Sequence, residues 1–102
     1  MKEFLEQLGF EDITSDNFFM KYSLNEYFDW DDKYFNALYR RINDNGIITY
    51  IMHGTNGYID CIGIISKYGH KWQKSYQFVP NEYIKEVIFK LLISVEAKVL
   101  RL

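Results

Sequence analysis

The dipeptide Asn56-Gly57 stands between two apolar runs and constrains the fold of this chain more than any other feature. Asn-Gly is strongly preferred in two-residue β-hairpin turns of type I′, because both turn residues need positive φ. Such a turn fixes which residues of the two strands face each other. The predicted pairs are Ile48 with Ile65, Tyr50 with Gly63, Met52 with Cys61 and His53 with Asp60.

Gly69-His70 is the second turn signal, since glycine at the first position suits a two-residue loop of type II′. It predicts Lys67 opposite Trp72, Gly63 opposite Tyr76 and Cys61 opposite Phe78. The two turns together predict an antiparallel meander of residues 47–53, 58–68 and 71–79. One face of this meander would be apolar, with a tyrosine on either side of Gly63, and Trp72, Tyr50, Tyr76 and Phe78 would belong to the core.

Helical patterns flank this meander. Residues 2–8 predict a short helix ending at Gly9, and residues 18–24 predict a strand. Residues 31–45 predict a helix with Asp31 or Asp32 as N-cap, Gly46 past its end, and Phe35, Leu38 and Ile42 as its buried stripe. Residues 80–102 predict a last helix, apolar on more than one side. The expected fold is α+β with the order α-β-α-β-β-β-α: an antiparallel meander of three to four strands with helices packed on one face.

The length of 102 residues predicts a single domain, 1–102. Sliding the chain by fifty positions pairs residues 22–42 with residues 72–92 in similar chemical classes. This leaves open a duplication with units 9–45 and 57–102, which would give two β-β-α units about a pseudo-twofold axis and a groove between them. Because amphipathic helices resemble one another, chance similarity is the competing explanation.

The second face of the meander mixes apolar and hydrogen-bonding side chains, and two explanations stay open for it. It is either a solvent face with a few isoleucines, or a face covered by the first half of the chain or by a partner. Aromatic residues make up 19% of the chain, more than a small core needs, and surface aromatics contribute strongly to binding. The candidate protein-binding residues are Ile51, Ile62, Ile64, Tyr68, Gln73 and Gln77.

Charge and cysteine content bound the setting of the protein. Residues 1–32 carry nine acids and two lysines, whereas residues 33–102 carry ten basic and five acidic residues. We expect the two halves to touch and offset each other's charge; a surface that faces a charged partner is the alternative. The single cysteine suits a reducing compartment, and the acidic start is unlike a signal peptide. Charges throughout 83–102 argue against a membrane span, so we expect a cytoplasmic protein.

The candidate chemical groups do not assemble into a catalytic or metal site. Asp60 could orient His53 as a general base, but Cys61 points to the other face and His70 lies at a turn. One cysteine and two separated histidines are too few for a structural zinc site. The acids Glu26, Asp29, Asp31 and Asp32 are explained by a helix start. We therefore expect no enzyme activity, no metal and no cofactor.

The segment 67–78 is basic and aromatic, which favours nucleic-acid binding as the alternative function. The expected helix–three strands–helix order of residues 31–102 is similar to the double-stranded-RNA-binding domain, a resemblance that implies RNA as the ligand. That family carries a lysine cluster where the last helix here begins PNEYIKEV, and the pI of 5.6 also argues against a phosphate-backbone ligand. The nucleic-acid candidates are Lys67, Tyr68, His70, Lys71 and Lys74.

These observations favour a small non-enzymatic protein-interaction module of adaptor or inhibitor type. Its partner would be a protein or peptide, bound on a sheet face, on the edge of strand 71–79 or in the inter-repeat groove. A homodimer through the last helix is a further alternative, with Phe89, Ile93 and Leu100 at its interface. Small chains of this kind are often inhibitors, immunity factors or products of viruses and mobile elements.

Overall fold

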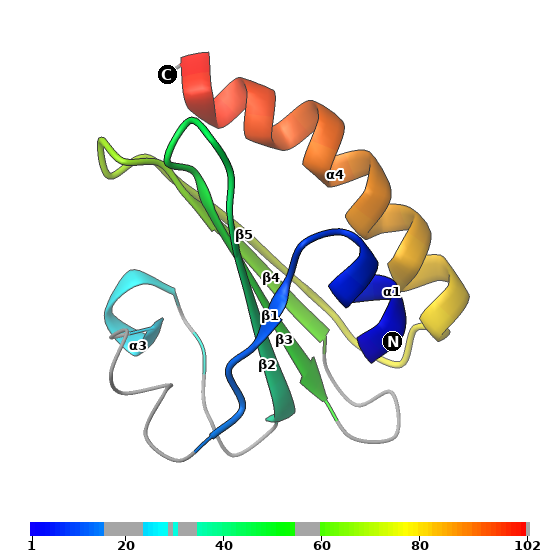
Figure 1. The fold of residues 1–102 in the computed structure, drawn as a ribbon. Coiled ribbons are helices and arrows are strands. Elements are labelled where there is room, and N and C mark those ends of the chain that lie inside the picture. The colour runs from blue at the N-terminus through cyan, green and yellow to red at the C-terminus, as the bar shows by residue number, and fades with distance from the viewer. Residues whose placement is uncertain (16–23, 29, 31–34, 55–59, 102) are drawn as a thin grey trace.

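The protein is a small α+β domain built on a five-stranded antiparallel sheet with strand order β1-β2-β3-β4-β5 (Figure 1). The computed structural model describes residues 1–15, 24–28, 30, 35–54 and 60–101. Their elements are α1 (Lys2–Gln7), β1 (Glu11–Asp12), α3 (Leu24–Tyr27), β2 (Phe35–Ile42), β3 (Ile48–Gly54), β4 (Asp60–Ile65), β5 (Lys71–Tyr76) and α4 (Asn81–Arg101). The first helix is confirmed, with Gly9 at φ 91° just beyond its end.

Each face of the sheet is covered by a different layer, and the helices predicted at residues 2–8 and 80–102 share one face, as expected. Helices α1 and α4 lie on one face, and α3 lies on the other (Figure 1). The helix-covered face buries Leu5, Ile51, Ile62, Ile84 and Ile88 in one cluster. The opposite face buries a second, aromatic-rich cluster under residues 24–28 and 30, with members Ile13, Leu24, Phe28, Trp30, Leu38, Tyr50, Met52 and Cys61.

The register of β3 against β4 is confirmed. Met52 lies opposite Cys61, Tyr50 opposite Gly63, and His53 opposite Asp60. The Asn56-Gly57 turn that predicted this register lies outside the described residues. Gly63 is covered by Phe28, because a Cβ at this position would lie 2.6 Å from the ring of Phe28. Its predicted cover, a tyrosine on each side, is therefore wrong on the β5 side.

The register of β4 against β5 differs from the prediction by three residues. Trp72 lies opposite Ile64 and Tyr76 opposite Asp60, while Ser75 lies opposite Cys61. Because an odd shift moves a side chain to the other face, Trp72 and Tyr76 pack with the cluster under α1 and α4. Phe78 lies beyond the strand and is exposed, so its predicted place in the core is wrong.

The shift has a local cause in the turn itself. The loop holds three residues, Lys67, Tyr68 and Gly69, and is closed by Ser66 and His70. The Ser66 N–H donates to the His70 carbonyl at 2.8 Å, and the Gly69 N–H donates to the Ser66 carbonyl at 3.0 Å. The Ser66 hydroxyl accepts from the N–H groups of Tyr68 and His70. Gly69, at φ 89°, takes the left-handed position of a three-residue hairpin loop.

The predicted helix at 31–45 is wrong over its described part, where residues 35–42 form β2. Leu38 and Tyr39 are adjacent and both buried, which is the pattern of a strand covered on both faces. Gly46, at φ 78°, closes a hairpin rather than a helix. Asn43 receives the Gly46 N–H on its carbonyl and the Ile47 N–H on its side chain. This turn repeats the Ser66–His70 construction, and a left-handed glycine suits both hairpins and helix ends.

The strand at 35–42 also affects two larger interpretations. The duplication paired these residues with 85–92, which lie in helix α4, so the paired segments do not share a structure. The order that resembled the double-stranded-RNA-binding domain began with a helix where β2 now stands. The predicted strand at 18–24 and the N-cap at Asp31 or Asp32 lie outside the described residues, except that Leu24 begins α3.

The last helix is confirmed as α4. Ile84 and Ile88 are fully buried against the sheet, and Val87, Leu91 and Leu92 pack beside them. No helix in the described part of the chain is both long and apolar enough to cross a membrane.

Candidate functional site: the β5 edge and its flanks

The two edge strands of the sheet differ in length and cover. β1 has only two residues, and the Thr14 side chain extends its contact with β2 by accepting the Leu38 N–H at 2.8 Å. β5 has six residues and forms the other edge. Four of its six residues are exposed, the exceptions being Trp72 and Tyr76. The longer, exposed edge is therefore at β5.

The hydrogen-bonding direction of β5 follows from its turn. Ser66 and His70 form a hydrogen-bonded pair, and such pairs alternate along an antiparallel ladder. Trp72, Lys74 and Tyr76 therefore direct their backbone groups toward β4. Residues 71, 73 and 75 direct their N–H and carbonyl groups toward the outer edge. Edge groups that point outward are the template on which an added strand pairs.

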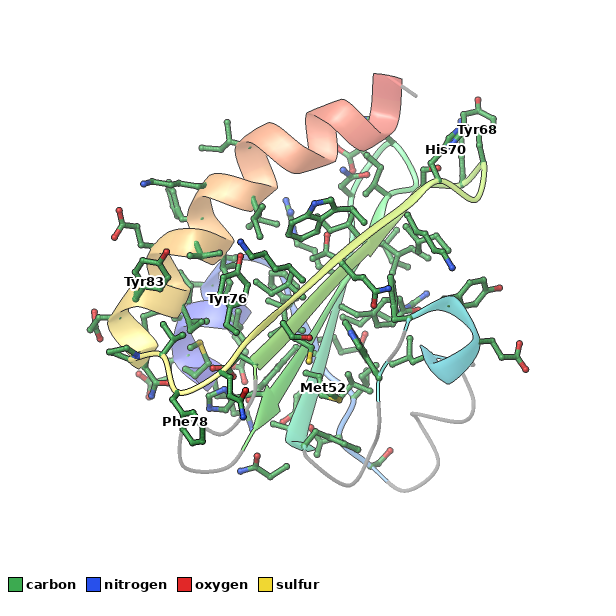
Figure 2. The ribbon with its side chains drawn as sticks, turned by 180° about the vertical axis from the view of Figure 1, so that it is seen from behind. Met52, Tyr68, His70, Tyr76, Phe78 and Tyr83 are labelled. Atoms are coloured by element: carbon green, nitrogen blue, oxygen red, sulfur yellow. The ribbon has the colours of Figure 1, made fainter. Side chains whose placement is uncertain are left out.

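Basic and aromatic side chains gather along the β4–β5 hairpin. All five nucleic-acid candidates, Lys67, Tyr68, His70, Lys71 and Lys74, are exposed. The Lys67 ammonium lies 5.1 Å from the ring centre of Tyr68, and that of Lys74 lies 5.3 Å from the ring of Tyr76. Figure 2 shows Tyr68 and His70 at the tip of the hairpin, far from Tyr76 and Phe78 at its other end.

The far end of β5 carries a second group of aromatics. Phe78 is 67% exposed and has φ 57°, a left-handed conformation that is rare for a bulky residue. Tyr76 and Tyr83 lie close to the start of α4 (Figure 2). Burial raises the pKa of the Tyr76 hydroxyl, and nearby Tyr83 raises it further. Tyr68 and Phe78 therefore stand beyond the two ends of the edge strand.

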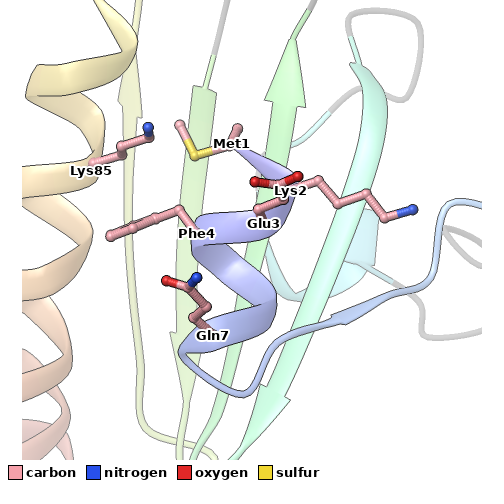
Figure 3. A pocket seen from close by; sticks show the side chains of 6 residues that line it. All are labelled: Met1, Lys2, Glu3, Phe4, Gln7 and Lys85. Carbon is pink, nitrogen blue, oxygen red and sulfur yellow. The ribbon is translucent and has the colours of Figure 1, made fainter.

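Two shallow pockets adjoin along α1 and α4, and they share Phe4 and Lys85. The first, shown in Figure 3, has a volume of about 490 Å³ and is lined by Met1, Lys2, Glu3, Phe4, Gln7 and Lys85. The second is lined by Phe4, Glu82, Lys85, Glu86, Phe89 and Lys90. Its charges are paired, Lys85 with Glu82 at 3.4 Å and Lys90 with Glu86 at 3.0 Å. The second pocket therefore has a mainly apolar wall and paired charges, whereas the first is mainly polar.

The predicted protein-binding residues divide into two groups. Ile51, Ile62 and Ile64 are buried, at 1% exposure or less, on the face that the chain's own helices cover. This face of the sheet is therefore a covered face and not a solvent face. Tyr68, Gln73 and Gln77 are exposed along and beyond β5. Of the six predicted residues, these three therefore lie at the surface.

His53 and Asp60 are brought together as the register predicted. The Nδ1 atom of His53 contacts the Oδ1 atom of Asp60, whose side chain is 2% exposed. Cys61 lies on the other face, where its Sγ is 3.3 Å from the Ser75 Oγ. Burial raises the pKa of the Cys61 thiol, and the neighbouring Asp60 charge adds to this, against the Ser75 hydrogen bond.

The described residues also include no group of three or more His, Cys, Asp or Glu side chains placed to hold a metal ion. Glu26 is exposed in α3, and the three aspartates predicted beside it lie outside the described residues. Of the four acids in the predicted carboxylate cluster, Glu26 alone is among the described residues.

The outward direction of residues 71, 73 and 75 is the feature that the sequence analysis missed. Its signal was the Ser66-x-x-Gly69 pattern, which favours a three-residue loop and sets the alternation along β5.

No protein-family model, no curated protein and no solved structure matches this chain.

Proposed function

We propose that this chain is a small non-enzymatic protein-interaction module, which binds an extended segment of a partner protein along the edge of β5. One observation carries the proposal: β5 is a six-residue edge strand whose residues 71, 73 and 75 turn their backbone groups outward. A partner segment would add a sixth strand, with Tyr68, Gln73 and Gln77 beside it. A cytoplasmic setting belongs to the same proposal, because a lone cysteine suits a reducing compartment.

The test uses two variants of one residue. Ser75→Pro removes an outward N–H, and proline is tolerated at such positions of edge strands. Ser75→Ala keeps the N–H and removes only the hydroxyl. Short random peptides are displayed and panned against the protein, and enriched peptides are then measured singly against both variants. We expect Ser75→Pro to weaken binding at least about tenfold and Ser75→Ala to leave it within about twofold, since one backbone hydrogen bond and the strand alignment are lost.

Amide hydrogen exchange provides a second test that does not depend on a variant folding. Binding along the edge should slow exchange at Lys71 and Ser75 more than at amides within α4. Equal peptide binding to Ser75→Pro and the parent chain, or protection confined to α4, would exclude the edge as the binding site.

Nucleic-acid binding by the β4–β5 hairpin is the second candidate. It is favoured by the joint exposure of Lys67, Tyr68, His70, Lys71 and Lys74 on one hairpin. The test is fluorescence anisotropy with labelled duplex RNA, duplex DNA and single strands at low and high salt. Micromolar binding that weakens steeply with salt would favour this candidate over the peptide proposal. We expect no binding.

A homodimer through α4 remains an alternative arrangement of the same module. Phe89 and Ile93 are exposed on this helix, at 53% and 68%, whereas Leu100 lies outside the residues whose side chains are described. Light scattering after gel filtration tests it, because a monomer at high protein concentration would exclude the dimer.

A further inference from the structure

We propose that the segment bound along β5 is acidic, an inference that rests on the proposed function. The charge of the site motivates it. Residues 61–81 contain Lys67, Lys71 and Lys74 and no aspartate or glutamate. All three lysines are exposed on the hairpin that ends in β5. The site is therefore locally basic within a chain whose formal net charge is −2.

The lysines of β5 lie on both sides of the strand. Side chains alternate along a strand, so Lys71 lies on the face of Gln73 and Ser75, and Lys74 lies on the face of Trp72 and Tyr76. An added strand also presents its side chains alternately to the two faces. Acids on either face of that strand would thus meet a lysine, and a segment with several acids would meet both.

Two carboxylates of the described residues near β5 have partners other than its lysines. Asp60 is buried against His53, and Glu82 at the start of α4 pairs with Lys85. Among the ion pairs of the described residues, none involves Lys71 or Lys74. The positive charge of the edge is therefore available to a carboxylate from outside the chain.

The same lysines argue against a second copy as the occupant. Lysines on an edge strand are a common device against pairing between copies, because each copy brings the same charge to the seam. An acidic segment relieves that repulsion, whereas another β5 adds to it. The lysines of β5 therefore disfavour pairing with a second β5 but still allow an acidic strand to pair with this edge.

The test compares labelled peptides of the length of β5 that differ only in charge. One repeats Thr-Thr-Glu-Glu, so that its glutamates lie on both faces of the added strand, and the other two carry Gln or Lys in place of every Glu. Binding is measured by fluorescence anisotropy at low and physiological salt. The protein variants are Lys71→Gln/Lys74→Gln, and Lys90→Gln as the matched control, since Lys90 is exposed on α4 and pairs with Glu86.

We expect the Glu peptide to bind about tenfold more tightly than the Gln peptide at low salt, from two screened lysine–carboxylate pairs. The Lys peptide should bind most weakly. The preference for Glu over Gln should fall below about twofold in Lys71→Gln/Lys74→Gln and persist in Lys90→Gln.

The contrary outcomes separate the two proposals. Equal binding of the Glu and Gln peptides, with loss of both in Ser75→Pro, would overturn the acidic partner and leave the edge function standing. Failure of both peptides to bind would overturn the inference; if panning also enriches no peptide that depends on the Ser75 N–H, the edge function falls with it. A single-stranded RNA that displaces the Glu peptide and binds more tightly would overturn the inference in favour of nucleic acid.

Discussion

The two faces of the sheet are buried by different means. Under α1 and α4 the contacts are largely aliphatic, with Ile62 and Ile88 among the fully buried side chains. On the other face, Phe28 and Trp30 cover the sheet with aromatic rings. Phe28 stacks on Trp30 at 4.6 Å between ring centres and meets Tyr50 edge-on at 6.3 Å.

The two faces of the sheet are specified in different ways. A long helix buries a face through many similar contacts, so each methylene contributes through its own packing. A short segment depends on a few large rings, and these need room at a defined place in the sheet. Gly63 provides that room, because any Cβ there would meet Phe28. The aliphatic face should therefore respond to lost volume and the aromatic face to added volume.

The largest effect should come from lost volume under α4. Ile88 is 1% exposed, and Ile88→Ala should lower the free energy of unfolding by about 3 kcal/mol through lost burial and a cavity. Ile88→Val is the matched control, with an expected loss of about 1 kcal/mol. Urea unfolding followed by tryptophan fluorescence measures both. A loss below about 1 kcal/mol for Ile88→Ala would mean that the helix does not depend on this contact.

Added volume on the aromatic face should have the next largest effect. Gly63→Ala places a methyl group 2.6 Å from the Phe28 ring and should cost about 2 kcal/mol. Phe28→Leu removes the ring, so the double variant should recover about 1 kcal/mol relative to additivity. Additive losses in the same unfolding experiment would show that Phe28 does not press on Gly63.

A third variant acts at the β1 edge, outside the two packed faces. The Thr14 hydroxyl accepts the Leu38 N–H and donates to the Asp12 carboxylate. This second bond, followed by the hydrogen bond from the Thr14 N–H and by the Lys2 charge, lowers the pKa of the Asp12 carboxyl despite its partial burial. Thr14→Val should cost about 1 kcal/mol at neutral pH, whereas Thr14→Ser, which keeps the hydroxyl, should cost less.

The pH dependence follows from the sign of that shift. A carboxyl whose pKa is lower in the folded state stabilises the fold above its unfolded pKa and loses that contribution as pH falls through the folded value. The gap between the parent chain and Thr14→Val should therefore narrow below about pH 4. The part due to the Leu38 N–H should remain. A gap that widens on acidification would contradict the Asp12 contact.

The smallest effect should come from the outer side of α4. Phe89 is 53% exposed next to fully buried Ile88, and Phe89→Ser should change the free energy of unfolding by less than about 0.5 kcal/mol. Helix propensity is similar for the two residues. A loss above about 1 kcal/mol that grows with protein concentration would instead show that Phe89 is buried between two copies.

The sequence predicted the parts of this fold that depend on local turn chemistry. Asn56-Gly57 indicated the register of β3 against β4, and the His53–Asp60 contact follows from it. The predictions at two other turns, those of Gly46 and Gly69, were wrong, because a left-handed glycine suits several structures. Gly46 suits the end of a helix and Gly69 a two-residue loop, but each closes a three-residue hairpin loop. In both turns the deciding groups are side chains at the first position, Asn43 and Ser66, which accept backbone N–H groups.

The candidate site was partly predictable for the same reason. The basic character of the β4–β5 hairpin is a property of composition, and Lys71 and Lys74 are exposed as the alternative function required. The residues of β5 that point outward depend on the length of the β4–β5 loop. The sequence predicted two residues for this loop, and it holds three. Ile62 lies beneath α4 because of contacts between residues that are distant in sequence, and no local sequence pattern predicts such contacts.

Because the Cys61 thiol is buried, the rate at which it is modified reports how often the structure around it opens. A thiol reacts with disulfide reagents as the accessible thiolate, and here it is buried, with a raised pKa and its Sγ beside Ser75 of β5. Modification must therefore wait for an opening that exposes the thiol: separation of β5 from β4, movement of the segment that carries Phe28 and Trp30, or global unfolding. A ligand bound on β5 should slow the labelling of this thiol to the extent that separation of β5 from β4 contributes to those openings.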